Sequence, residues 1–485
     1  MNTIKSVIII FIFIGLSSCS DDFLDVTPSN SGDASTSIET LADAKVMLTG
    51  IMSKLTSSNY YGRNFLLYAE AKGGDLTTMS MGRGQDGLYS FNHSQTTGSY
   101  SGFWNSIYSS ILQANNLIVN IEKLEAAGAE ANFDDIKGQA LTVRALMYFD
   151  LVRIYGKPYS YDKDSYGVPN VLEPLEALDQ PLRATVAENY TQIIADLKAA
   201  ESLLSKSKTN GYLNYYTNLS MQARVYLNME QYPAALSAAQ TVIDSGVYSL
   251  YSNAEWVVSW TDQFGSESIF ELAILPSEAD LGNSSLSIYL RRAGHKSSQA
   301  AGQFIASDYY LNRLGQDTDD VRWGILDYDE VSATHMGASY KYSGDTDVGG
   351  DGKSTPTAVN IKVIRLSEIY LIAAEAAFHS DKDLAATYLN AIRQRAPNLA
   401  PSTAATVSID MILDEKSKEL FTEGQRFFDM VRLDKDITFN DDLGGVPIST
   451  RSKTIDRSFY KTILPISQEE INANPEIENQ QNPGY

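Results

Sequence analysis

The chain has 485 residues, of which 43% are hydrophobic and 10% aromatic, and its formal net charge at pH 7 is −22. This composition is typical of a globular protein and excludes a disordered chain. The negative charge argues against nucleic acid and anionic lipid as ligands, and leaves neutral, cationic or metal-bridged ligands open. With 29 Tyr and 4 Trp, the chain has many amphipathic rings for a binding surface.

Residues 1–18 have the pattern of a lipoprotein signal peptide. Lys5 provides a positive start, Val7 to Leu16 form an apolar run too short to span a bilayer, and small residues precede Cys19. That cysteine is the only one in the chain, and it stands where bacterial lipoproteins are acylated. One acyl chain anchors a protein only reversibly, so durable anchoring needs more than one. We therefore predict a lipid anchor on Cys19, followed by a flexible acidic tether over 19–36.

Residues 37–250 are predicted to be mainly helical. Apolar residues recur at helical spacing over 37–55, 103–125, 136–156, 187–205 and 213–229. A repeat is visible near the end of this region, where small and aromatic residues follow the tetratricopeptide pattern. These residues are Ala223, Tyr226, Ala235 and Ala239. Helical hairpins of this kind bury one face by stacking, so we expect a curved array.

Between residues 56 and 101 the chain is rich in Gly, Ser, Asn and Tyr, and we expect an irregular loop. Loops of this length in a compact protein are usually functional. Residues 82–87 fit the G-x-G-x-x-G pattern, but the flanking strand and helix that a dinucleotide site needs are not evident. We consider the loop a possible ligand-binding segment, with ordinary surface turns as the alternative. Its candidate ligand-binding residues are Tyr60, Tyr61, Arg83, Asp86 and Tyr89.

Helical periodicity fades over residues 251–360, although SESIFELAIL indicates a short strand. This irregular insert is a second candidate for the ligand face. Its candidate ligand-binding residues are Arg291, Tyr309 and Trp323. The stretch 345–353 resembles both a calcium loop and a phosphate loop and satisfies neither, because Gly349 stands where a calcium ligand is required. We expect a surface loop there, with a weak Ca²⁺ site as the alternative.

Residues 361–485 begin with two helical stretches, 365–379 and 383–396, whose small residues suit a close antiparallel hairpin. A longer helix is predicted from the N-cap Ser408 to Leu433. Three charged residues of that helix lie at the edge of its apolar stripe, and we interpret them as half-buried ion pairs that join helices. They are Glu419, Glu423 and Arg426. Catalysis by the second glutamate would need a partner base or nucleophile, and none is nearby in the sequence.

No catalytic or metal-binding signature is found in the chain. The four histidines are scattered without the spacing of metal ligands, and the nucleophile motif G-x-S-x-G is absent. We therefore predict no catalytic and no metal site. The 60 acidic residues leave open a glycoside hydrolase with paired carboxylates, which nothing else in the sequence indicates.

Several stretches together resemble the SusD/RagB family of outer-membrane lipoproteins of Bacteroidetes. The stretches occur in the order of the family and span nearly the whole mature chain. They are the start at Cys19 with SDDFLD, WNSIYSSILQANNLI, RALMYFDLVRIYGKPY, IRLSEIYLIAAEAA with LNAIRQRA, EKSKELFTEGQRFFDMVRL, and the terminal LPIS followed by QNPGY. Ser467 departs from the family, which often has Pro there.

The resemblance implies a mostly all-α fold, in which tetratricopeptide-like hairpins form a curved scaffold with a loop-rich ligand-binding insert. It also implies a non-enzymatic protein that is lipid-anchored in the outer membrane and faces the exterior. Such a protein captures a glycan, or alternatively a peptide, and passes it to a SusC-like TonB-dependent transporter. The family's binding residues lie in its most variable loops, so the resemblance assigns no binding role to a numbered residue.

Overall fold

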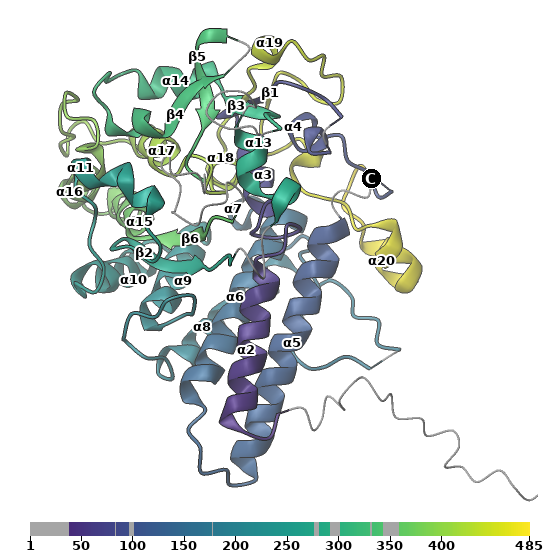
Figure 1. The fold of residues 1–485 in the computed structure, drawn as a ribbon. Coiled ribbons are helices and arrows are strands. Elements are labelled where there is room, and N and C mark those ends of the chain that lie inside the picture. Colours follow the sequence, from purple (N-terminus) through teal and green to yellow (C-terminus); the bar gives the residue numbers. More distant parts are fainter. Residues whose placement is uncertain are drawn as a thin grey trace, which may run out of the picture.

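The computed structural model has a lower half of long helices and an upper half of short helices, strands and loops (Figure 1). The lower half contains α2 (Leu41–Leu55), α5 (Ser101–Ala126), α6 (Asp134–Tyr155) and α8 (Val186–Glu201). The structure describes residues 38–82, 84–96, 101–176, 178–275, 281–291, 301–329, 332–342 and 358–485. The predicted signal peptide and tether lie outside these residues, as does the possible calcium loop.

The other elements are shorter. The α-helices are α3 (Asn64–Ala71), α4 (Asp86–Ser90), α7 (Tyr159–Asp162), α9 (Tyr215–Asn228), α10 (Tyr232–Asp244), α11 (Asn253–Trp256), α13 (Leu286–Leu290), α14 (Asp308–Leu314), α15 (Leu366–Phe378), α16 (Lys382–Arg393), α17 (Ile409–Glu419), α18 (Arg426–Arg432), α19 (Asp441–Gly444) and α20 (Gln468–Ala473). The 3-10 helices are η2 (Val258–Thr261), η3 (Gly282–Ser284), η4 (Val321–Ile325), η6 (Tyr460–Thr462) and η7 (Pro475–Gln480). The strands are β1 (Leu76–Thr78), β2 (Ser268–Leu272), β3 (Phe304–Ala306), β4 (Leu326–Asp329), β5 (Ser332–Ser339), β6 (Ile361–Arg365), β7 (Ile437–Thr438) and β8 (Thr454–Ile455).

The long helices begin where side chains satisfy their free backbone N–H groups. Thr40 and Asp43 form a reciprocal capping box at the start of α2, with the Thr40 N–H donating to the Asp43 carboxylate at 2.9 Å. Thr185 and Glu188 form the same arrangement at the start of α8. The helices predicted over 37–55 and 187–205 are therefore confirmed; α2 starts later than predicted, whereas α8 starts one residue earlier and ends earlier.

Two helical hairpins continue the scaffold. Helix α9 packs on α10 and α15 packs on α16, and α10 contacts α15, so the two hairpins stack side by side. Ala223, Ala235 and Ala239 are completely buried, which lets these helix axes approach closely. The predicted hairpins and their stacking are confirmed.

Each of the described strands pairs with one antiparallel partner, and most partners are distant in the sequence. β1 pairs with β3, β2 with β6, β4 with β5, and β7 with β8. The strand predicted from SESIFELAIL is confirmed as β2. The pairings β1–β3 and β2–β6 cross the predicted boundaries at residues 250 and 360. That division stays a prediction, but buried residues from all three regions contribute to one hydrophobic core.

The prediction of an irregular loop over residues 56–101 is only partly right. Helix α3 lies within this stretch, and all eight of its residues are buried. A helix that is buried on every side shows no polar face, so its sequence lacks the amphipathic period that reveals surface helices. Strand β1 and the short helix α4 also fall in this stretch.

The single helix predicted from Ser408 to Leu433 is wrong, because a turn divides it into α17 and α18. Thr422 and Gly424 have φ values of 65° and 81°, outside the helical region. The Glu70 carboxylate accepts hydrogen bonds from the backbone N–H groups of Thr422, Gly424 and Gln425, at 3.1, 2.8 and 3.2 Å. Glu70 comes from α3, so the break depends on a residue far away in the sequence.

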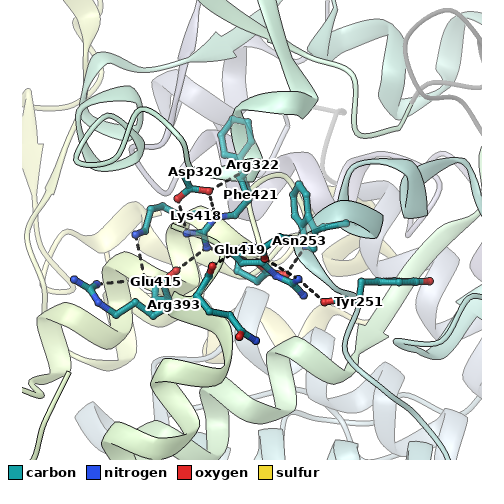
Figure 2. A network of polar contacts seen from close by, with 12 residues as sticks. Tyr251, Asn253, Asp320, Arg322, Arg393, Glu415, Lys418, Glu419 and Phe421 are labelled. Atoms are coloured by element: carbon teal, nitrogen blue, oxygen red, sulfur yellow. Dashed lines mark hydrogen bonds and ion pairs between the residues drawn. The ribbon is translucent and has the colours of Figure 1, made fainter. Parts of the chain in front are cut away.

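Of the three charged residues predicted as half-buried ion pairs, Glu423 and Arg426 are half-buried and paired as predicted, whereas Glu419 is completely buried in a larger network (Figure 2). Arg322, from η4, contacts Glu415 at 2.6 Å and Glu419 at 3.5 Å, and all three side chains are 0% exposed. The network also includes Asp320, Lys418 and Arg393, which lie around Glu415 in the second half of α17.

A second part of the network joins the strands to the same helix. Arg365, at the end of β6, contacts Glu267 at 2.9 Å, Glu419 at 3.2 Å and Glu423 at 2.7 Å. Burial opposes ionisation of Glu419, but Arg365, Arg395 and Arg322 outweigh it and lower its pKa to about 2. Lys341, which follows β5, also pairs with Glu423. Glu423 thus joins Lys341 and Arg365, which come from different parts of the chain.

Within the described residues, none of the helices combines the length and the apolar character needed to cross a bilayer.

We expect the Glu375→Gln substitution to lower the free energy of unfolding at pH 7 by about 3 kcal/mol, because it leaves two buried cations with Asp429 as their shared counter-ion. Arg432 and Lys416 contact Glu375 at 2.5 and 2.8 Å. Burial opposes ionisation of Glu375, but these two cations lower its pKa from 4.5 to about 2. The stabilisation is therefore present above pH 4.5 and is lost as the pH falls towards 2.

Urea unfolding followed by circular dichroism at pH 7 and pH 3 checks this prediction. The difference between variant and wild type should shrink by about 2 kcal/mol at the lower pH. Glu130→Gln, at an exposed position, is the matched control. An equal difference at both pH values would show that Glu375 is not stabilised by ionisation.

Candidate ligand-binding face

The prediction that Tyr60 and Tyr61 present their rings to a ligand is wrong for this structure. Their exposed fractions are 0% and 4%, and both hydroxyls donate to the Asp150 carboxylate, at 2.6 and 2.7 Å. Asp150 in turn pairs with Arg153 at 2.6 Å. The two rings are needed in the core because they satisfy a carboxylate that α6 buries.

Tyr89 and Arg291 are also corrected, because both side chains are completely buried. The Tyr89 hydroxyl donates to Asp441 at 2.8 Å, and the Arg451 guanidinium lies 4.8 Å from the centre of the Tyr89 ring. Arg291 donates to the carbonyl of Ser287 at 3.3 Å. Arg83 lies outside the described residues, so its role stays a prediction.

Three predicted residues do reach the surface, at two separate places. Asp86 and Tyr309 are half-buried. Asp442 raises the pKa of Lys453, and Tyr309 makes a smaller contribution in the same direction, so Tyr309 lies near this lysine. Trp323 is also half-buried, but it donates its indole N–H to the Asp317 carbonyl at 3.2 Å. Asp317 follows the end of α14 and Tyr309 lies at its start, so Trp323 and Tyr309 are at opposite ends of this helix.

A cluster of polar side chains lies at the edge of the β1–β3 pair, and we name it the polar edge. It consists of Ser80, Asp86 and Gln303. The backbone N–H of Met79 donates to the Gln303 carbonyl at 2.8 Å, which extends the ladder one residue beyond the strands. The Gln303 amide lies 3.4 Å from the Ser80 carbonyl and 3.5 Å from the Asp86 carboxylate. Two connections from distant parts of the sequence are thereby brought together.

Two atoms of the polar edge lack a hydrogen-bond partner. They are the Ser80 hydroxyl oxygen and the Gln303 side-chain oxygen Oε1, both of which are buried. Gln303 is 0% exposed as a residue. Buried polar atoms are nearly always paired in native proteins, because an unpaired one costs about 1–3 kcal/mol. Such atoms mark a place where a ligand or water can supply the missing partner.

Helix α19 borders the polar edge and comes very close to the backbone of β1. A Cβ added at Gly444 would lie 1.9 Å from the Thr78 carbonyl oxygen, so only glycine permits this approach. Asp442 and Lys453 form an exposed ion pair on the same side. This border therefore offers charged groups of both signs next to uncharged hydrogen-bonding groups.

Only part of the polar edge has a signal in the sequence. Ser80 and Asp86 belong to the Gly-rich stretch that was predicted to bind a ligand, but nothing in the sequence around Gln303 marks it as buried and unpaired. Within the described part of the chain, no group of three or more His, Cys, Asp or Glu residues is arranged to hold a metal ion. The polar edge offers uncharged hydrogen-bonding groups and one carboxylate.

Comparison with protein families gives matches at both ends of the chain. A family described as "SusD family" matches residues 328–485, and one described as "Starch-binding associating with outer membrane" matches residues 22–227. Among curated proteins, the SusD-like protein P25 of Formosa agariphila is 24% identical over 278 residues, which are 55% of this chain and 51% of P25. The chain thus spans about half the length of that relative.

Solved structures match nearly the whole chain. A SusD superfamily protein from Bacteroides thetaiotaomicron VPI-5482 is 33% identical, with a TM-score of 0.83 and coverage of 92% of this chain and all of that one. A laminarin-binding SusD-like protein shares the fold, with 23% identity, a TM-score of 0.72, and coverage of 92% and 100% of the two chains. The mostly helical fold, the order of its elements and these matches agree, and the chain belongs to the SusD/RagB family.

Proposed function

We propose that this protein is a lipid-anchored nutrient-binding protein of the outer membrane that captures a glycan at the polar edge. It then passes the glycan to a SusC-like TonB-dependent transporter. Proteins of the SusD family bind ligands and are not catalysts, so a glycoside hydrolase is not proposed. The description of one matching family as starch-binding and associated with the outer membrane supports both the ligand class and the location.

The observation that carries the ligand class is the pair of unpartnered atoms in the polar edge. A sugar hydroxyl can donate directly to the half-buried Asp86 carboxylate, whereas Gln303 Oε1 and the Ser80 hydroxyl are buried and are reached through a bridging water. Neutral polyols suit this chain because its net charge of −22 repels anions. The laminarin-binding relative gives further support, since a protein with the same fold binds a glycan.

Tyr309 and Trp323 are proposed as secondary contacts for a long glycan. Aromatic rings stack on the C–H faces of sugars, and both rings are half-buried rather than enclosed. They lie at the two ends of α14, so one short oligosaccharide would reach one of them. Tyr309 is the nearer in sequence to Gln303, six positions away.

We expect the double substitution Asp86→Ala with Gln303→Ala to weaken glycan binding at least tenfold, because it removes two hydrogen-bonding groups from the polar edge. Isothermal titration calorimetry with laminarihexaose and maltohexaose, chosen after a glycan-array screen of the wild type, measures the effect. Unchanged affinity for a glycan that the wild type binds would exclude the polar edge as the site.

Tyr61→Phe is the matched structural control and a prediction of its own. Losing the hydroxyl leaves Asp150 with one donor fewer, so we expect a loss of about 1–2 kcal/mol in the free energy of unfolding. Glycan affinity should stay within twofold of the wild type, because the ring lies in the core. Calorimetry and urea unfolding on the same preparation separate the two effects. A large loss of glycan affinity would show that Tyr61 does contribute to the ligand site.

Replacement of Cys19 tests the proposed anchor. We expect Cys19→Ala to abolish labelling by a radioactive or alkynyl fatty acid and to move the protein out of the membrane fraction, because no other acylation position is available. Fractionation of cells followed by immunoblotting measures the shift. Membrane retention of the unlabelled variant would point to a different means of attachment.

A further inference from the structure

A groove of about 310 Å³ lies away from the polar edge, where α5, the connection between α7 and α8, and α20 meet. Helix α20 lies at the right of Figure 1, beside the upper end of α5, whereas β1 and β3 lie at the top. The volume is at the lower end of the range of small-molecule sites. The proposed glycan site does not use this groove.

The walls of the groove are mainly apolar. Trp104 and Tyr108 lie on one side with their ring centroids 4.8 Å apart, and Leu112, Val171 and Leu175 add aliphatic surface. Leu175 is 41% exposed, so its side chain faces partly into solvent at the rim. A ligand with a flat apolar body would bury this surface.

The polar groups of the groove are dominated by acceptors. Glu470 accepts a hydrogen bond from the Trp104 side chain, and burial raises the pKa of this carboxyl group. Asn474 is 3% exposed and donates its amide N–H to the Pro181 carbonyl at 2.9 Å, but its Oδ1 is buried without a partner. Asp179 adds a second carboxylate to the lining.

No Lys, Arg or His is among the residues that line this groove. Two cations lie near the lining: the Lys54 ammonium donates to the Ser109 hydroxyl at 3.4 Å, and Arg183 lies close enough to influence Tyr108. The Arg183 guanidinium is engaged by main-chain carbonyls, donating to Gly167 at 2.7 Å and to both Tyr155 and Tyr166 at 3.0 Å. Arg183 donates a fourth hydrogen bond to the Gln480 carbonyl. Arg183 therefore leaves the groove carboxylates without a direct cationic partner.

We propose that this groove binds a small organic cation with an apolar body, such as an aryl-alkyl ammonium. The apolar part lies against Tyr108 and the aliphatic side chains, and the ammonium donates to Glu470 and to Asn474 Oδ1. An ammonium group has three donors and no acceptor, which matches a lining rich in acceptors. It also supplies the positive charge that a half-buried carboxylate lacks.

Tryptamine, tryptophol and indole-3-acetate test the proposal, because they share an indole ring and differ in charge. Using the purified soluble body of the protein with its full fold, we expect tryptamine to bind with a Kd of about 1 mM or tighter. Tryptophol should bind at least tenfold more weakly and indole-3-acetate more weakly still. Ligand-observed NMR and calorimetry measure the three affinities. Equal binding of the amine and the alcohol, or no binding of the amine, would overturn the proposal.

Substitutions locate the site. Glu470→Gln keeps an acceptor for the Trp104 indole and should weaken tryptamine binding about tenfold without changing tryptophol binding. Glu469→Gln, at the neighbouring exposed position of the same helix, is the matched control and should leave all affinities unchanged. Ala473→Phe should fill the groove and abolish binding of all three probes. Tryptamine binding that survives both Glu470→Gln and Ala473→Phe would place the cation elsewhere and refute the assignment.

The outcome is independent of the proposed glycan function. Tryptamine should not compete with a bound glycan, and the Asp86→Ala and Gln303→Ala double variant should bind tryptamine normally. Competition between the two ligands would show that they share one site and would contradict a separate groove.

Discussion

The buried ion pairs on α17 are the constraint on which the rest of the fold depends. Arg322 belongs to the irregular insert, Arg365 to β6, and Arg395 follows α16, yet all three direct their charge to Glu419. Removing such charges from water costs several kcal/mol per ion, and their mutual attraction offsets that cost only when the geometry is good. Each segment can therefore reach its final position only when the others are present. This mutual dependence joins the insert to the helical hairpins.

Contacts between distant segments also explain the turn between α17 and α18. Glu70 has a buried carboxyl group that accepts hydrogen bonds from three backbone N–H groups of that turn. Burial raises its pKa to about 7, and the neighbouring Asp75 contributes in the same direction. The turn and α3 therefore fix each other's position. Because β1 follows α3 directly, the strand that carries the polar edge is held by the same contact.

The sequence predicted the features that depend on local chemistry. Helix α2 follows from its apolar spacing, and the hairpins follow from small residues such as Ala235. The missed features depend on partners that are distant along the chain. Nothing near Tyr61 reveals that Asp150 will accept its hydroxyl, so a Tyr-rich stretch looked like a surface loop. Helix α3 escaped prediction because burial on every side removes the amphipathic pattern.

The candidate site was only partly predicted, because some of its features also depend on partners that are distant along the chain. Asp86 lies in a Gly-rich stretch whose composition suggests a functional loop, and it does reach the surface. Gln303 follows an unremarkable Ala-Gly pair, and its importance arises only from the pairing of β3 with β1. Whether a buried atom lacks a hydrogen-bond partner depends on the residues that surround it in the fold, so no local sequence pattern indicates it.

The structure also separates stability from recognition. The Ser80 hydroxyl makes no hydrogen bond in the fold, so replacing it removes nothing on which the scaffold depends. The Tyr61 hydroxyl, in contrast, satisfies a buried carboxylate, and its loss leaves part of a charge unpaired. The hydrogen-bonding groups of the polar edge can therefore change while the ionic network and the hairpins stay the same. Because buried charges in the interior hold the scaffold together, the surface connections can vary in sequence while the fold is kept. Such variation suits a family of proteins that bind different ligands.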